Sequence, residues 1–98
     1  MIIGKVVGNL WATRKDEKLN GLKFLIVKRQ LNRDTYSDEL IIAVDNAGAG
    51  IEDEVLITTG SSARISLQGR GDVPVDMVIV GIIDKMDYTE WKEWAYEY

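Results

Sequence analysis

Five short runs of branched aliphatic residues, separated by turns that carry glycine, constrain the fold of this 98-residue chain more than any other feature. The runs are rich in valine and isoleucine, which favour β-strands over helices. Short strands joined by glycine turns predict a small closed or partly closed β-barrel. The expected strands span residues 2–13, 22–30, 39–44, 54–59 and 77–83.

Two of these strands have unusual patterns. Gly4 and Gly8 interrupt the first strand, which predicts strong bending or the close approach of a neighbouring backbone. Residues 14–21 are polar and end in Asn-Gly, a strong turn signal. In the strand at residues 22–30 the apolar side chains alternate only partly, which indicates that both of its faces are largely covered.

A short helix is expected between the fourth and fifth strands. Ser61 or Ser62 could cap it, because a serine hydroxyl accepts a hydrogen bond from the free amides of a first turn. Gly69 and Gly71 would end the helix and make a flexible loop before Pro74, the only proline.

The C-terminal residues 87–98, DYTEWKEWAYEY, hold five of the eight aromatic side chains. Their spacing of i, i+3, i+4 and i+7 places four side chains on one face of a helix. A helix this short is marginal alone in water, so its indoles must pack either on their own barrel or on a neighbouring subunit. The residues on this face are Trp91, Trp94, Ala95 and Tyr98.

Asp87 and Glu90 resemble a capping box at the start of this helix, although aspartate replaces the usual serine or threonine. The expected organisation is therefore a barrel over residues 1–85 and an aromatic tail over residues 86–98, with tail docking through Trp91, Trp94 and Tyr98.

Missing residue types exclude much chemistry. The chain has no cysteine, and therefore no disulfide, thiolate metal site or cysteine nucleophile. It has no histidine, the commonest acid–base residue and metal ligand. We expect no catalytic residues, no metal and no cofactor. The sequence has no 18-residue apolar run and no signal-peptide pattern, so we expect no membrane partner and a cytoplasmic location.

The stretch GAGIED at residues 48–53 is not a phosphate cradle. A dinucleotide loop needs a third glycine and a following helix, and a P-loop needs a GK[ST] triplet. A strand follows here instead. Gly48 and Gly50 are better understood as positions that allow positive φ or tight backbone contact.

Other candidate sites fail on similar grounds. Ser61 and Ser62 follow Gly60 but have no base to accept a hydroxyl proton, so capping is the better interpretation. The acids at Glu52, Asp53 and Glu54 lack the spacing of a calcium loop. Arg64 is either a surface cation or a bidentate partner for a carboxylate across an interface.

The net charge of −4 disfavours binding to nucleic acid, which draws affinity from lysine and arginine. An OB-type single-stranded nucleic-acid-binding module remains the alternative, because such binders use a small barrel with exposed aromatics. The expected strands supply only Trp11 and Phe24 for that purpose.

Motifs along residues 1–85 resemble one family, the pentameric vertex proteins of bacterial microcompartment shells, which includes the carboxysome vertex protein and its ethanolamine-utilisation relatives. Five pieces occur in the family's order and at its spacing. They are Gly4-Lys5-Val6 with Gly8, LNGLK at residues 19–23, AVDNAGAG at residues 43–50, EVL at residues 54–56 with GSSAR at residues 60–64, and PVD at residues 74–76 with VGIID at residues 80–84.

The resemblance implies an all-β, OB-like five-stranded barrel, to which the residues themselves add the short helix before the last strand and the probable C-terminal helix. It also implies a homopentamer without catalytic activity that sits at the vertices of a shell, beside hexameric shell proteins. The chain departs from the family at Ala47, where valine or isoleucine is frequent, and in the tail, which is variable.

We expect the GAG loop and the GSSAR block to lie near the interface between subunits or near the ring axis. The residues concerned are Asn46, Gly48, Ala49, Gly50, Gly60, Ser61, Ser62 and Arg64.

Overall fold

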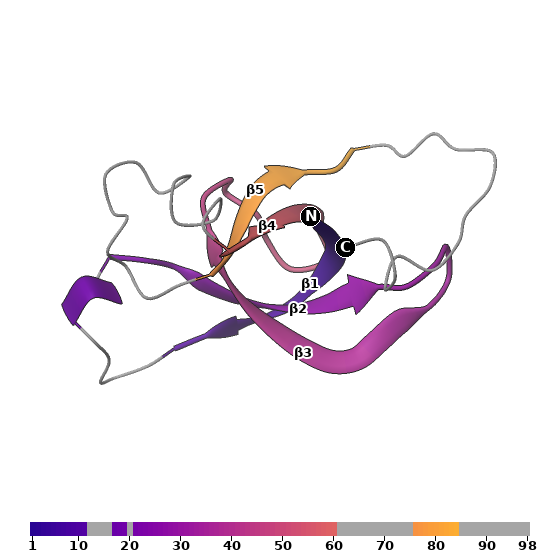
Figure 1. Ribbon diagram of the computed structural model, residues 1–98, viewed down its shortest axis with the longest axis horizontal. Helices are drawn as coiled ribbons and strands as arrows, with labels where there is room; N and C mark the ends of the chain where they lie inside the picture. Colours follow the sequence, from indigo (N-terminus) through magenta and orange to yellow (C-terminus); the bar gives the residue numbers. More distant parts are fainter. Residues whose placement is uncertain (12–16, 20, 61–75, 85–98) are drawn as a thin grey trace.

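Five strands form a closed barrel in the computed structural model, which describes residues 1–11, 17–19, 21–60 and 76–84. Around the wall the strand order is β1-β2-β3-β5-β4 (Figure 1). The all-β barrel expected from the sequence is confirmed. The elements are β1 (Ile2–Leu10), the 3-10 helix η1 (Glu17–Leu19), β2 (Phe24–Gln30), β3 (Tyr36–Asp45), β4 (Glu54–Thr59) and β5 (Met77–Ile82).

All neighbouring strands pair antiparallel except β3 and β5, which are parallel. That parallel ladder joins only Val44 to Val78 and Asp45 to Ile79. Most of β3 therefore pairs on one edge only, with β2, among the described residues. In Figure 1 the long β3 curves away from β5 towards the bottom of the view.

The barrel interior is filled by aliphatic side chains from every strand. Alternation along each strand turns every second residue inward, and the loop after β3 adds Ala49 to the same cluster. Burial of these side chains is the main stabilising contribution to a domain this small. The residues of this core are Ile2, Val6, Leu25, Val27, Ala43, Ala49, Val55, Ile57 and Ile79.

Gly4 is required where β1 crosses β2. A Cβ added there would lie 2.5 Å from Cγ1 of Val27 and 2.8 Å from the backbone oxygen of Lys28. The close backbone approach expected at this glycine is thus confirmed. Near Gly8 the β1–β2 register shifts, between Val6 and Gly8, as in a β-bulge that bends the strand.

A second apolar cluster lies outside the barrel. Val44 and Val78 are buried on the outer side of β3 and β5 under Leu19, Leu22 and Phe24. Both faces of the wall are therefore apolar at this end, which matches the incomplete alternation expected for residues 22–30.

The largest differences from the expected strand boundaries are at the end of β1 and the start of β3, while β2 begins two residues later than expected, at Phe24. β1 ends at Leu10 because its last pair is Leu10 with Phe24. β3 begins at Tyr36, inside the expected loop, because the turn closes early when Leu31 donates to the carbonyl of Thr35 at 2.9 Å and Tyr36 pairs with Gln30. The helices expected after Gly60 and in the tail lie outside the described residues, as does the proposed tail segment.

No helix among the described residues is long and apolar enough to span a bilayer.

Candidate functional site

The loop between β3 and β4, residues 45–53, is organised around one buried carboxylate. The side chain of Asp45 is only 3 % exposed. Its oxygens accept hydrogen bonds from the amide of Ala47 at 3.0 Å and from the amide of Ala49 at 3.0 and 3.2 Å. Asp45 thus folds the loop back on itself in an Asx-type turn.

Lys23 ties this loop to the start of β2. Its ammonium lies 3.7 Å from Oδ2 of Asp45 and donates to the carbonyl of Ala49 at 3.3 Å. The Lys23 carbonyl accepts from the Asp45 amide at 2.9 Å. Lys23 and Asp45 are distant in sequence, but they hold the same loop through both their side chains and their backbone groups.

The far end of the loop is fixed in the same way. The amide of Gly50 donates to Oδ2 of Asp53 at 2.8 Å. Glu52, with φ of 79°, donates its amide to Val6 at 2.9 Å, and Val6 donates back to Asp53 at 3.0 Å. Acids that stand as a cluster in the sequence serve here as local turn partners, and the Glu52 side chain pairs with Lys5 at 3.6 Å.

The residues expected near an interface occupy different environments. Asn46, Gly48 and Gly60 are exposed, whereas Ala49 is 2 % exposed and packs in the barrel core. The side chain of Ala49 therefore supports the loop from inside its own chain. Ser61, Ser62, Arg64, Trp91, Trp94 and Tyr98 lie outside the described residues.

The two glycines of the GAG stretch play different parts. Gly48 has φ of +76°, a conformation that favours glycine, as the sequence suggested. Gly50 does not have positive φ, and a Cβ there would meet only Oδ2 of Asp53 at 3.9 Å. Of the two alternatives expected at these glycines, positive φ is confirmed at Gly48, whereas Gly50 has neither positive φ nor a tight backbone contact within its own chain.

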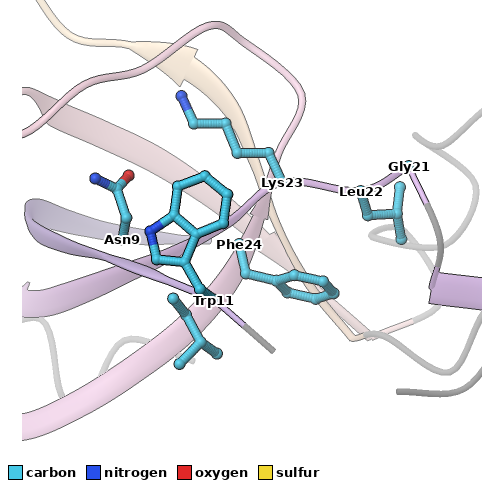
Figure 2. Close-up of a pocket in the computed structure, with 7 residues that line it drawn as sticks. Asn9, Trp11, Gly21, Leu22, Lys23 and Phe24 are labelled. Atoms are coloured by element: carbon cyan, nitrogen blue, oxygen red, sulfur yellow. The ribbon is translucent and has the colours of Figure 1, made fainter. Parts of the chain in front are cut away.

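Sequence reasoning missed a pocket of about 390 Å³ at the end of β1. Figure 2 shows Trp11, Leu22, Lys23 and Phe24 around it, together with Asn9 and Gly21. Its lining has no carboxylate, hydroxyl or thiol, and its only amine, that of Lys23, contacts Asp45 and the carbonyl of Ala49. The only sequence signal was the aromatic Trp11 beside a glycine turn, because the pocket forms from segments that pairing of β1 with β2 brings together.

Among the described residues, no group of three or more histidine, cysteine, aspartate or glutamate side chains could hold a metal ion. The loop is partly exposed, with Asn46 and Gly48 at the surface, and hydrogen bonds to Asp45 and Asp53 hold its backbone.

A family model and individual relatives match most of this chain. The family described as "Ethanolamine utilisation protein EutN/carboxysome" matches residues 1–84. The chain is 37 % identical to the bacterial microcompartment shell vertex protein GrpN of Rhodospirillum rubrum, over 89 % of this chain and 97 % of that protein. It is 40 % identical to the carboxysome shell vertex protein CcmL of Nostoc, over 86 % of this chain and 83 % of that protein.

Solved structures agree with the sequence relatives. The structure described as the GrpN pentameric microcompartment shell protein from Rhodospirillum rubrum matches with a TM-score of 0.80 and 33 % identity, over 92 % of this chain and 100 % of that chain. Structure and sequence therefore agree on one assignment. This chain belongs to the EutN/CcmL family of ethanolamine-utilisation and carboxysome proteins.

Proposed function

We propose that this chain is a structural protein of a bacterial microcompartment shell, where it forms pentamers that occupy the vertices. The observation that carries the proposal is the likeness to the pentameric GrpN structure, which extends over the whole of that chain. The vertex role given in the names of GrpN and CcmL supports the location.

The physical reason for a ring follows from symmetry. A contact between two different patches of one chain closes into a ring when its rotation divides a full turn. Six-fold tiles alone make a flat layer, so a closed polyhedron needs five-fold units at its corners. The partners of this chain are then further copies of itself and, at the edges of the ring, hexameric shell proteins.

A non-enzymatic role is part of the proposal. The relatives are structural shell vertex proteins, and the sequence contains no histidine or cysteine. The alternative, a nucleic-acid-binding OB module, finds no support among these relatives, and the negative charge of the chain disfavours it.

Co-expression with a hexameric shell protein tests the vertex role. Closed particles should form when this chain is present, and open sheets or tubes when it is left out, because only the five-fold unit introduces curvature at a corner. Electron microscopy of the two preparations decides the matter. Equal numbers of closed particles without this chain would contradict the proposal.

The exposed residues Asn46 and Gly48 of the loop are proposed to face a neighbouring subunit or the ring axis, together with Gly50 in the same loop and Gly60 directly after β4. The same proposal extends to Ser61, Ser62 and Arg64, which follow Gly60 in sequence. The loop is held rigidly by Asp45 and Asp53, so a neighbour would meet a surface that needs little ordering on association.

Replacing Gly50 with valine is expected to weaken ring formation more than barrel folding. Within the chain a Cβ at this position has room, so the added bulk acts mainly on a neighbour. We expect at least tenfold weaker association, about 1.4 kcal/mol per contact. Size-exclusion chromatography with light scattering measures the association and circular dichroism the fold.

Thr35→Val is the matched control, because Thr35 is exposed in the β2–β3 turn. It should assemble normally. If Gly50→Val also forms normal rings at low micromolar concentration, the placement of this loop near an interface is wrong.

A further inference from the structure

The outer face of β1, β2 and β3 is apolar, and only part of it is covered by the described residues. Val44 and Phe24 pack with Leu19 and Leu22, whereas Leu10, Leu40 and Ile42 stay exposed. Residues paired across antiparallel strands point to the same side of a sheet, so the register gives the members of each row. The outward rows are Leu10–Phe24–Val44, Gly8–Ile26–Ile42 and Lys5–Lys28–Leu40. We call these three rows the outer β1–β3 face.

Two features distinguish this face from scattered exposed residues. β2 is apolar on both sides, with Leu25 and Val27 inside the barrel and Phe24 and Ile26 outside. A strand with one solvated face normally alternates between apolar and polar residues. On the adjacent strand, Leu40 is 54 % and Ile42 43 % exposed, so the apolar surface continues to the free edge of β3.

Gly8 gives this face a recess. Gly8 has no side chain, so the space over Ile26 that a β1 side chain would fill stays open. A Cβ at Gly8 would lie 3.5 Å from Cδ1 of Ile26. Val7 beside it is exposed, as is Leu10 two residues on. A flat aromatic ring fits such a shallow site, bordered by aliphatic side chains.

The sequence after Asp84 supplies an apolar stripe that lacks a partner. The family match ends at residue 84, before the aromatic residues of the tail. Trp91, Trp94 and Tyr98 share one face of the expected helix, and such a helix needs a surface to pack on.

The charges of the tail and of the outer β1–β3 face are also complementary. Residues 87–98 contain four carboxylates and one lysine. On the outer β1–β3 face the side chain of Lys28 forms no ion pair with another described residue, and Lys5 adds a second cation that Glu52 partly neutralises. An acidic, aromatic helix therefore complements an apolar face with cations along one row.

The origin of the tail decides between its own barrel and a neighbour. β5 is next to β3 and β4 in the barrel. On the β3 side the pairing ends at Asp45 with Ile79, so Ile82 lies about 20 Å along the strands from Ile42, at roughly 3.3 Å per residue. On the other side β4 and β1 lie between β5 and β2, about 14 Å around the wall at roughly 4.8 Å per strand. Residues 85 and 86 span about 7 Å before the expected helix begins. The tail of the same chain would therefore have to double back across its own barrel to reach Ile42.

We propose that the aromatic segment at residues 87–98 of one subunit packs on the outer β1–β3 face of the next subunit in the ring. This inference rests on the proposed pentamer. A head-to-tail ring joins two different patches of the same chain, so a tail that leaves one patch can pack on a different face of the neighbouring subunit. Each tail then joins adjacent subunits across their contact.

The absence of native cysteine allows a direct test by cross-linking. Ile42→Cys marks the outer β1–β3 face, and Ala95→Cys marks the middle of the aromatic stripe without removing an indole. The two single variants are co-expressed as full-length chains and treated with a short bis-maleimide linker. A two-chain band on a denaturing gel is expected from the mixture, and single chains from each variant alone.

The control replaces Ile42→Cys by Asp34→Cys, an exposed position in the β2–β3 turn, and should give no two-chain band. The double variant Ile42→Cys/Ala95→Cys examines packing of the tail on its own barrel. A cross-link within one chain, together with none in the co-expressed mixture, would overturn the proposal. A mixture without any cross-link would overturn it as well, since the tail would then pack elsewhere.

The same samples show whether a negative result contradicts the placement of the tail or the proposed pentamer. Their assembly mass is measured before cross-linking. Five-membered rings that give no cross-link between chains would overturn the tail placement alone. Samples that never assemble would overturn the ring itself.

Discussion

Alanine in place of Gly4 is expected to destabilise the barrel by roughly 3 kcal/mol, near the upper end for overpacking in a core. The added methyl would lie 2.5 Å from Cγ1 of Val27 and 2.8 Å from the backbone oxygen of Lys28. The valine could change rotamer, but the carbonyl belongs to β2 and could move only by disturbing the β1–β2 ladder. Urea denaturation at a fixed chain concentration measures the effect.

Gly81→Ala is the matched control for this substitution. Gly81 also lies in a strand, but a Cβ there meets only Cβ of Leu56 at 3.9 Å, an ordinary contact. It should change the free energy of unfolding by less than about 1 kcal/mol. Equal denaturation midpoints for Gly4→Ala and Gly81→Ala would show that the crossing of β1 and β2 is looser than described.

Removal of the Asp45 carboxylate is expected to have the second large effect. Asp45→Ala leaves the amides of Ala47 and Ala49 without their acceptor, and Ala49 is buried in the core. Hydrogen bonds to charged groups contribute about 1.5–3 kcal/mol, and a buried donor left without an acceptor costs a similar amount. We therefore expect a loss of about 3 kcal/mol in the free energy of unfolding, measured by the same denaturation.

The Lys23→Met variant measures the contribution of the Lys23–Asp45 ion pair separately from that of the amide hydrogen bonds to Asp45. The Lys23 side chain is more than half exposed, so its attraction to Asp45 contributes less than about 1 kcal/mol. Asp45→Asn keeps one acceptor oxygen, so its loss in the free energy of unfolding should lie between those of Lys23→Met and Asp45→Ala. If Lys23→Met were as damaging as Asp45→Ala, the ion pair rather than the amide contacts would hold the loop.

The number and type of strands followed from local sequence, because β-branched runs and glycine turns act over a few residues. Gly4 and Gly48 were also recognisable, since glycine within a strand indicates close backbone approach and glycine in a tight turn indicates positive φ. The start of β3 at Tyr36 was missed because a polar turn of residues 31–38 looks the same whether or not its last residues pair with a strand.

The supports of the loop could not be predicted from local sequence. Asp45 and Lys23 meet only because β2 and β3 pair side by side, with the Asp45 amide bonded to the Lys23 carbonyl. The role of Ala49 as a core residue was missed for the same reason: the loop turns inward only after Asp45 binds its amides. Contacts of this kind depend on the closed barrel, which no short stretch specifies.

The incomplete alternation of apolar and polar residues in β2 predicted part of the outer β1–β3 face. The apolar residues of β2 signalled that both faces would be covered, and Phe24 is indeed packed with Leu22 and Val44. The pattern did not identify what covers Ile42 and Leu40. That assignment needs the strand register, the free edge of β3 and the position where the chain leaves β5.

Native mass spectrometry of the purified full-length chain tests the central claim most directly, because it counts subunits. The account predicts a dominant species at five times the 11.0 kDa mass of one chain, stable over a range of concentrations and ionic strengths. A sample that stays at the mass of one chain, or at another whole-number multiple under every condition, would contradict it.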